Sequence, residues 1–129
     1  RDALEQLAPA PVLVCLHHPP LLVGSAWLDG VGLRNAPDLL EVIDAFEHVR
    51  VVLGGHVHQE FEQCRDGKLF LATPSTCAQF TPRTERCVMD LKPPGYRWLE
   101  LHPDGSCRTE VRWLEDWVVA ERPPDDRFD

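Results

Sequence analysis

Two short, mainly apolar runs, residues 12–16 and 49–53, the second interrupted by Arg50, constrain the fold of this chain more than any other feature. Each run is apolar on both of its faces, which is the pattern of a fully buried strand in a parallel sheet. Between them lie a loop and a helix that Pro37 begins. Strand, loop, helix and strand in this order predict a right-handed crossover unit of an α/β sheet. The helix has a single apolar stripe, made by Leu39, Leu40, Val42, Ile43 and Phe46.

The segments around the first apolar run have clear boundaries. Ala3, Leu4 and Leu7 have helical spacing, and the prolines that follow end this helix before the first strand. Residues 19–36 contain two prolines and three glycines, which are too many breakers for a regular element. We expect a long loop there, of the kind that often has a function.

The second half of the chain has the pattern of strands joined by short turns. Residues 61–64 and 69–72 flank an Asp66-Gly67 turn and predict a hairpin. Further antiparallel strands are expected at residues 86–91, 96–102 and 106–114. The predicted fold class is therefore α/β, with a mixed sheet of parallel crossover strands followed by antiparallel hairpins. We expect one domain over residues 1–115 and a charged, proline-containing tail over residues 116–129.

Charge and cysteine content exclude several classes of protein. The net charge of -8 argues against a sequence-independent nucleic-acid binder, because such a protein needs a basic surface. No apolar run approaches the ~20 residues that a membrane span requires, so no membrane partner is expected. The five cysteines form no CxxC pair and their number is odd, which predicts reduced thiols and a cytoplasmic location. Cys15 and Cys107 are interpreted as small buried apolar residues.

The strongest local signal is the segment Gly54-Gly55-His56-Val57-His58, which directly follows an apolar run. The two glycines permit a sharp turn, and two imidazoles one residue apart can diverge toward two neighbouring metal ions. The alternative interpretation is a surface turn with two unrelated histidines. The preceding strand and the glycine pair favour metal ligands.

A second signal, His17-His18-Pro19-Pro20, follows the other apolar run. A single histidine at a strand end is as often a polar cap as a metal ligand. The carboxyl ends of parallel strands, however, meet at one edge of a sheet, where ligands bind in open α/β folds. The two histidine-bearing strand ends therefore predict one common site.

These two motifs resemble the last two sequence motifs of the calcineurin-like metallophosphoesterases. Longer matches, over almost all of residues 4–114, resemble the bacterial 3',5'-cyclic-AMP phosphodiesterases of that superfamily. The resemblance implies half of an αββα sandwich, the C-terminal one, and hydrolysis of cyclic AMP by a metal-activated hydroxide. The segments that carry it are residues 25–29, 33–36, 54–60, 72–77 and 94–97.

The resemblance also implies the site. His17 and His56 would bind one metal ion and His58 the other, with iron, manganese or zinc as the usual occupants, and these three histidines would be the catalytic residues. His18 is an alternative to His17 as the ligand, or a residue that supports it. In the long loop, Arg34 and Asn35 are candidates for contact with a small-molecule cyclic nucleotide.

Other residues near the expected site have two interpretations. Asn35 could instead make local turn hydrogen bonds, and Thr76 could line the pocket or cap a loop. Trp27 could stack on a base or pack onto the domain.

The chain departs from the family pattern in one respect. The earlier family motifs, Asp-x-His, Gly-Asp and Gly-Asn-His, are absent from these residues. We therefore expect a missing N-terminal half, an isolated chain that is nearly inactive, and a homo-oligomer that covers an exposed apolar sheet face. The alternatives are another phosphodiester or phosphomonoester hydrolase of the superfamily, or a non-catalytic module that associates with itself.

Overall fold

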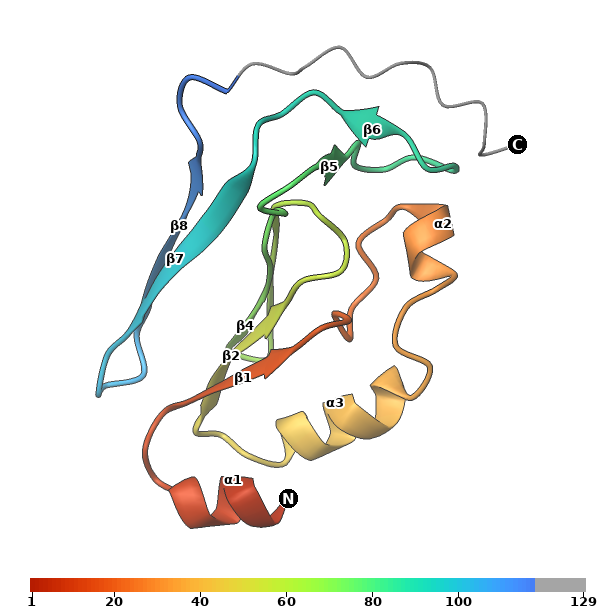
Figure 1. Ribbon diagram of the computed structural model, residues 1–129. Coiled ribbons are helices and arrows are strands. Elements are labelled where there is room, and N and C mark those ends of the chain that lie inside the picture. Colours follow the sequence, from red (N-terminus) through yellow and green to blue (C-terminus); the bar gives the residue numbers. More distant parts are fainter. Residues whose placement is uncertain (118–129) are drawn as a thin grey trace.

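The computed structural model describes residues 1–117. The last twelve residues of the predicted tail, 118–129, lie outside the described part of the chain. In the described part of the chain, the helices lie before the second strand, and the remaining strands follow one another (Figure 1). They are α1 (Asp2–Leu7), β1 (Val12–Leu16), α2 (Ala26–Asp29), α3 (Ala36–Asp44), β2 (Val49–Gly54), β3 (Phe61–Arg65), β4 (Lys68–Ala72), β5 (Gln79–Phe80), β6 (Met89–Asp90), β7 (Gly95–Leu101) and β8 (Cys107–Trp113).

The central sheet has four strands in the order β1-β2-β4-β3. β1 and β2 are parallel and are joined through α3, which confirms the predicted crossover unit. β4 lies parallel to β2, and β3 pairs with β4 as an antiparallel hairpin. Asp66 and Gly67, at the tip of this hairpin, have φ values of 50° and 73°, as the two central residues of a type I′ turn require. The predicted mixture of parallel and antiparallel strands is confirmed.

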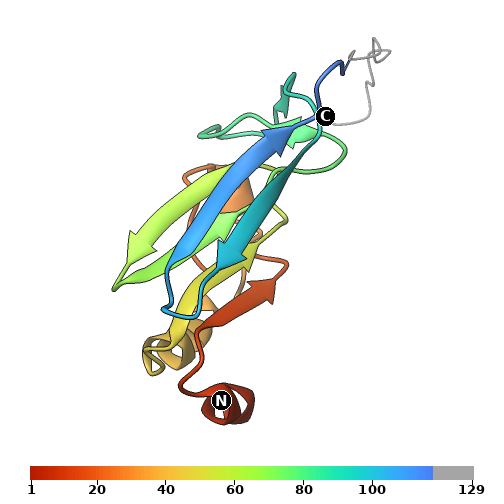
Figure 2. The same cartoon turned by 90° about the vertical axis from the view of Figure 1, so that its left-hand side faces the viewer.

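Figures 1 and 2 show α3 on one face of the central sheet and the β7–β8 hairpin on the other. On the α3 face, Ile43 packs against Val52 and Phe70 in one apolar cluster. On the other face, the Arg97 side chain of β7 donates hydrogen bonds to backbone carbonyls of the β3–β4 hairpin. Both faces of β2 are therefore covered.

For β2, this cover corrects the expectation of an exposed apolar face. Val51 and Val52 are 0% and 1% exposed, so the apolar run of β2 leaves no open surface. Cys15 on β1, by contrast, is exposed and not buried. Side chains alternate between the two faces of a strand, and Val14 and Leu16 pack on the α3 side. Cys15 thus points to the opposite face, on an edge strand.

Two further predictions are wrong in detail. The strand expected at residues 86–91 contains only the two residues of β6, and Leu91 beside it is 78% exposed. The apolar side chains of this segment have no layer to pack against, so the pairing between β5 and β6 does not extend further. The expected loop at residues 19–36 contains the one-turn helix α2, which forms because Leu28 anchors it at 2% exposure. No helix within residues 1–117 has the length and apolar character of a membrane span.

Candidate metal centre

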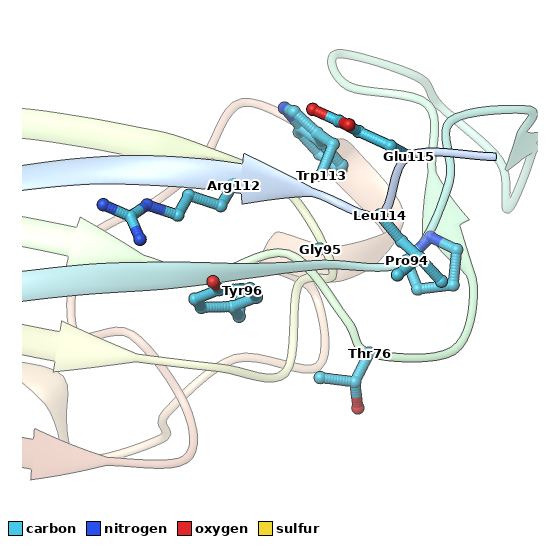
Figure 3. Close-up of a pocket in the computed structure, with 8 residues that line it drawn as sticks. All are labelled: Thr76, Pro94, Gly95, Tyr96, Arg112, Trp113, Leu114 and Glu115. Atoms are coloured by element: carbon cyan, nitrogen blue, oxygen red, sulfur yellow. The ribbon is translucent and has the colours of Figure 1, made fainter. Parts of the chain in front are cut away.

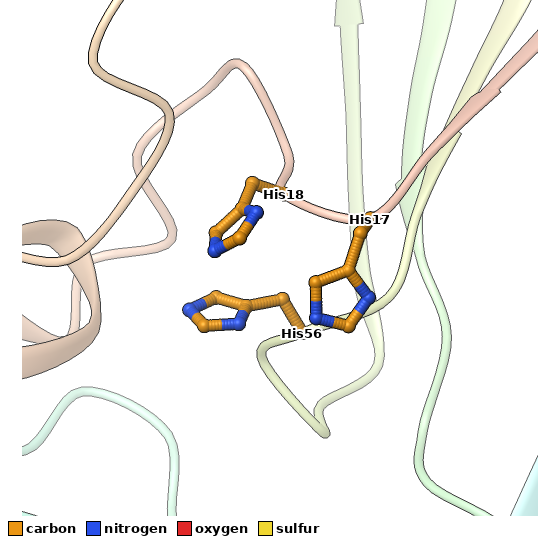
Figure 4. Close-up of side chains that lie close together, drawn as sticks. All are labelled: His17, His18 and His56. Carbon is orange, nitrogen blue, oxygen red and sulfur yellow. The ribbon is translucent and has the colours of Figure 1, made fainter.

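The ends of β1 and β2 bring three histidines together (Figure 4). Leu16 pairs with Gly54 at the last step of the parallel register, and the Gly55 backbone N–H donates to the His17 carbonyl over 2.9 Å. One nitrogen each of His17, His18 and His56 lies within 4.8 Å of the others. The predicted convergence of the two strand ends is therefore present, and it includes His18 as well as His17.

Gly54 allows this close approach. A Cβ atom on Gly54 would lie 3.0 Å from the Pro19 ring, so a larger residue would push the two strand ends apart. After the glycines, His56 and His58 have φ values of 55° and 48°. The left-handed region costs a non-glycine residue about 1–2 kcal/mol. Strain of this kind tends to occur at functional sites.

The environment of His56 suits a metal ligand. Its Nε2 atom is buried and has no hydrogen-bond partner in the described part of the chain. Burial lowers the pKa of His56 from its ordinary value of 6.5, and the neighbouring His18, His17 and His58 lower it further. Metal binding needs the neutral ring, and imidazole nitrogens suit zinc and iron. The donor set and the buried, unpaired nitrogen therefore fit a transition-metal ion.

His58 lies apart from the three clustered histidines. Its Nδ1 atom is 2.9 Å from the Ala78 carbonyl, and its ring stacks on Phe80 with centroids 4.8 Å apart. Because a carbonyl oxygen only accepts hydrogen bonds, the proton belongs on Nδ1 and the lone pair on Nε2. Nε2 is then the nitrogen that can bind a second ion.

The predicted substrate residues occupy different places. Arg34 and His56 both line a cavity of about 170 Å³, whose other lining residues are Val57 and residues of the 19–36 loop. Asn35 is exposed and precedes α3, without a side-chain capping bond. Thr76 lines a separate pocket of about 570 Å³ with Pro94 and the end of the β7–β8 hairpin (Figure 3).

Trp27 is packed onto the domain, which was one of its two interpretations. It packs on an apolar cluster that includes Leu28 and Val57, and it meets Phe80 edge to face at 4.9 Å. Phe80 and Ala78 are the residues near the site that the sequence reasoning missed. They belong to no motif, and a two-residue strand such as β5 has no recognisable periodicity.

The lowered pKa of His56 predicts how stability depends on pH. Between the depressed pKa in the folded protein and the ordinary value near 6.5, an unfolded chain binds a proton that the folded chain does not. The contribution of His56 to the free energy of unfolding is therefore fully present above pH 6.5 and declines as the pH falls through this window. Urea unfolding of the metal-free protein at pH 7.5 and 5.5 measures the decline, which should be smaller in His56→Gln. An equal decline in both proteins would contradict this explanation.

The fold and the histidine cluster together define a mixed α/β protein with a candidate metal centre at the carboxyl ends of its parallel strands. Over 115 residues the chain is 48% identical to the 3',5'-cyclic adenosine monophosphate phosphodiesterase CpdA of Escherichia coli strain K12. It is 41% identical over 118 residues to the enzyme of the same name from Pseudomonas aeruginosa. A 3',5'-cyclic-nucleotide phosphodiesterase of Nostoc is 43% identical over 108 residues.

These matches confirm the resemblance to bacterial cyclic-AMP phosphodiesterases. They cover 87%, 92% and 84% of this chain, and 42%, 43% and 41% of the relatives. The chain thus spans about two fifths of the length of these curated relatives. No protein-family model matches it. A solved structure of Vps29 from Entamoeba histolytica complexed with Zn²⁺ shares 22% identity at a TM-score of 0.36, covering 64% of this chain and 47% of that one.

Proposed function

We propose that this chain is part of a metal-dependent phosphodiesterase that hydrolyses 3',5'-cyclic AMP. The observation that carries the proposal is the buried Nε2 of His56, which has no hydrogen-bond partner among residues 1–117 and lies in a three-histidine cluster at two strand ends. Relatives named as cyclic-AMP phosphodiesterases, with 41% and 48% identity, support the choice of substrate.

Two metal positions are proposed. His17 and His56 would hold one ion, with His18 close enough to serve as a further or alternative nitrogen ligand. His58 would hold the second ion through Nε2. Imidazole nitrogens suit iron and zinc, whereas manganese prefers oxygen ligands and would depend on carboxylates that join the histidines. A pair of ions of this kind supplies Lewis-acid activation of water and stabilises charge on both the attacking and the leaving oxygen.

The chain's own residues would bind and orient the substrate. The burial that lowers the pKa of His56 keeps its ring neutral, so that it presents a lone pair near pH 7. Arg34, exposed at a cavity that His56 also lines, would attract the phosphodiester anion. This local charge matters because the chain as a whole carries a net charge of -8. Asn35 and Thr76 are further candidates for contact with the nucleotide.

The proposed site needs a bridging ligand in addition to the three clustered histidines. No carboxylate joins the three histidines in the cluster formed within residues 1–117, and the relatives are more than twice as long. We propose that residues 1–115 form one half of the catalytic domain, and that the rest of the longer protein supplies the bridging ligand. That the isolated chain forms a homo-oligomer remains a prediction. Sedimentation of the isolated chain measures its oligomeric state.

The proposed activity is tested on the full-length protein and on the isolated chain. With Mn²⁺ or Fe²⁺ present, the full-length protein should hydrolyse cyclic AMP faster than glycerophosphodiesters or phosphomonoesters, and a chelator should stop it. The isolated chain should be nearly inactive, because an incomplete site cannot hold two ions close together. Preference for another phosphoester would overturn the substrate assignment. Full activity of the isolated chain would overturn the proposed need for further ligands.

A further inference from the structure

The ring of His58 is held from two directions by the segment at β5. The Nδ1 atom donates to the Ala78 carbonyl over 2.9 Å. The Phe80 ring lies almost flat against the imidazole, with an angle of 9° between the planes and 4.8 Å between the centroids. The Phe80 backbone N–H also lies 3.4 Å from the His58 carbonyl. The hydrogen bond fixes the tautomer, and the stack restricts rotation of the ring.

Phe80 is itself held in place. The edge of Trp27 meets its ring at 87° and 4.9 Å, which is the favourable edge-to-face arrangement of two aromatic rings. β5 pairs with β6 through Phe80 and Met89. The stack on His58 is therefore supported from the side by α2 and along the backbone by β6.

The loop that carries Trp27 is tied to the segment after β5. The Arg83 backbone N–H donates to the Ser25 hydroxyl over 2.9 Å, and the Ser25 side chain is fully buried. Next to it, the Ala26 N–H donates to the Thr84 carbonyl over 3.1 Å. The side-chain amide of Gln59, one residue beyond His58, donates to the same Ser25 hydroxyl over 3.4 Å. These bonds join α2, the segment after β5 and the backbone beside His58 into one unit.

We propose that Phe80 is a positioning residue that fixes the His58 ring with Nε2 free to bind a metal ion. The inference rests on the proposed metal centre, but not on the identity of its substrate. Groups that orient a metal-binding histidine through its other ring nitrogen are generally worth about 10–100-fold in metal affinity or activity. Phe80 acts on the same ring through its face, and it holds the backbone next to Ala78.

The test replaces the ring in the full-length protein. Phe80→Leu keeps an apolar side chain but removes the flat aromatic face, while Phe80→Tyr keeps the face. Phe46→Leu is a matched control, because the ring of Phe46 also lies beside a histidine, His48, with 5.6 Å between the ring centroids. Two readouts are needed: Zn²⁺ affinity by competition with a chromophoric chelator, and the tautomer of His58 in the metal-free protein by nitrogen-detected NMR.

We expect Phe80→Leu to weaken Zn²⁺ binding roughly tenfold and to give a mixture of His58 tautomers. Phe80→Tyr and Phe46→Leu should leave both readouts unchanged. Unchanged Zn²⁺ affinity with a single tautomer in folded Phe80→Leu would overturn the proposal. If Phe80→Leu does not fold, Phe80→Met takes its place with the same expected loss, and unchanged Zn²⁺ affinity in that variant would overturn the proposal; a proton on Nε2 of His58 in the unsubstituted protein would also overturn it. Neither readout involves cyclic AMP, so a failure of this proposal can be distinguished from a failure of the substrate assignment.

Discussion

Replacing His56 with alanine in the full-length protein is expected to lower cyclic-AMP hydrolysis by about 100-fold or more. The estimate exceeds the ~10–100-fold effect of groups that only orient a ligand, because His56 would be a ligand itself. Its Nε2 has no other partner in the described part of the chain, so the ring has no competing hydrogen bond to keep. Metal content measured by elemental analysis should fall together with turnover. His58→Ala should act in the same direction through the other ion.

His102→Ala is the control for these substitutions. His102 is a partly exposed histidine at the turn between β7 and β8, 3.7 Å from Glu100 and outside the three-histidine cluster. Its removal should leave metal content and turnover within about twofold of the unsubstituted protein, as expected for a surface position. Full activity and full metal content in folded His56→Ala would defeat the site assignment.

The convergence of the histidines could be predicted from the sequence because geometry leaves few alternatives. Once residues 12–16 and 49–53 form parallel neighbours, their carboxyl ends must meet at one edge of the sheet. His17 follows the first end directly, and His56 follows the second after the glycine pair. The glycine pair before His56 predicts a close backbone approach, which Gly54 and Pro19 make.

The partners of His58 and the cover over β2 could not be predicted in the same way. Phe80 comes from a strand of two residues, too short for any period to appear. The cover over β2 depends on where a hairpin more than forty residues further along the chain packs. The local sequence pattern predicts the strands β7 and β8, but it does not predict the face of the central sheet on which they pack. Val51 is fully buried, against the expectation of an exposed apolar face on β2.

The attachment of the hairpin to the central sheet depends on one arginine. Arg97 of β7 has a side chain only 2% exposed, 3.8 Å from the carboxylate of Glu62. Its guanidinium donates to the Ala72 carbonyl over 3.2 Å and to the Thr109 hydroxyl over 3.1 Å, and lies 3.4 Å from the Phe61 carbonyl. Burial lowers the pKa of Arg97, an effect that Glu62 opposes. Glu62 is itself 56% exposed, so the ion pair contributes little and the hydrogen bonds to carbonyls matter more.

Arg97→Met is therefore expected to destabilise the fold by about 2–4 kcal/mol, since each buried carbonyl left unpaired costs roughly 1–3 kcal/mol. Ala72 is fully buried, and water cannot replace the lost donor there. Urea unfolding followed by tryptophan fluorescence measures the change. Arg108→Met is the matched control, because Arg108 is an exposed arginine on the neighbouring strand β8. It should change the free energy of unfolding by no more than about 0.5 kcal/mol. An equal loss in both variants would show that charge, and not the hydrogen bonds of Arg97, holds the hairpin on the sheet.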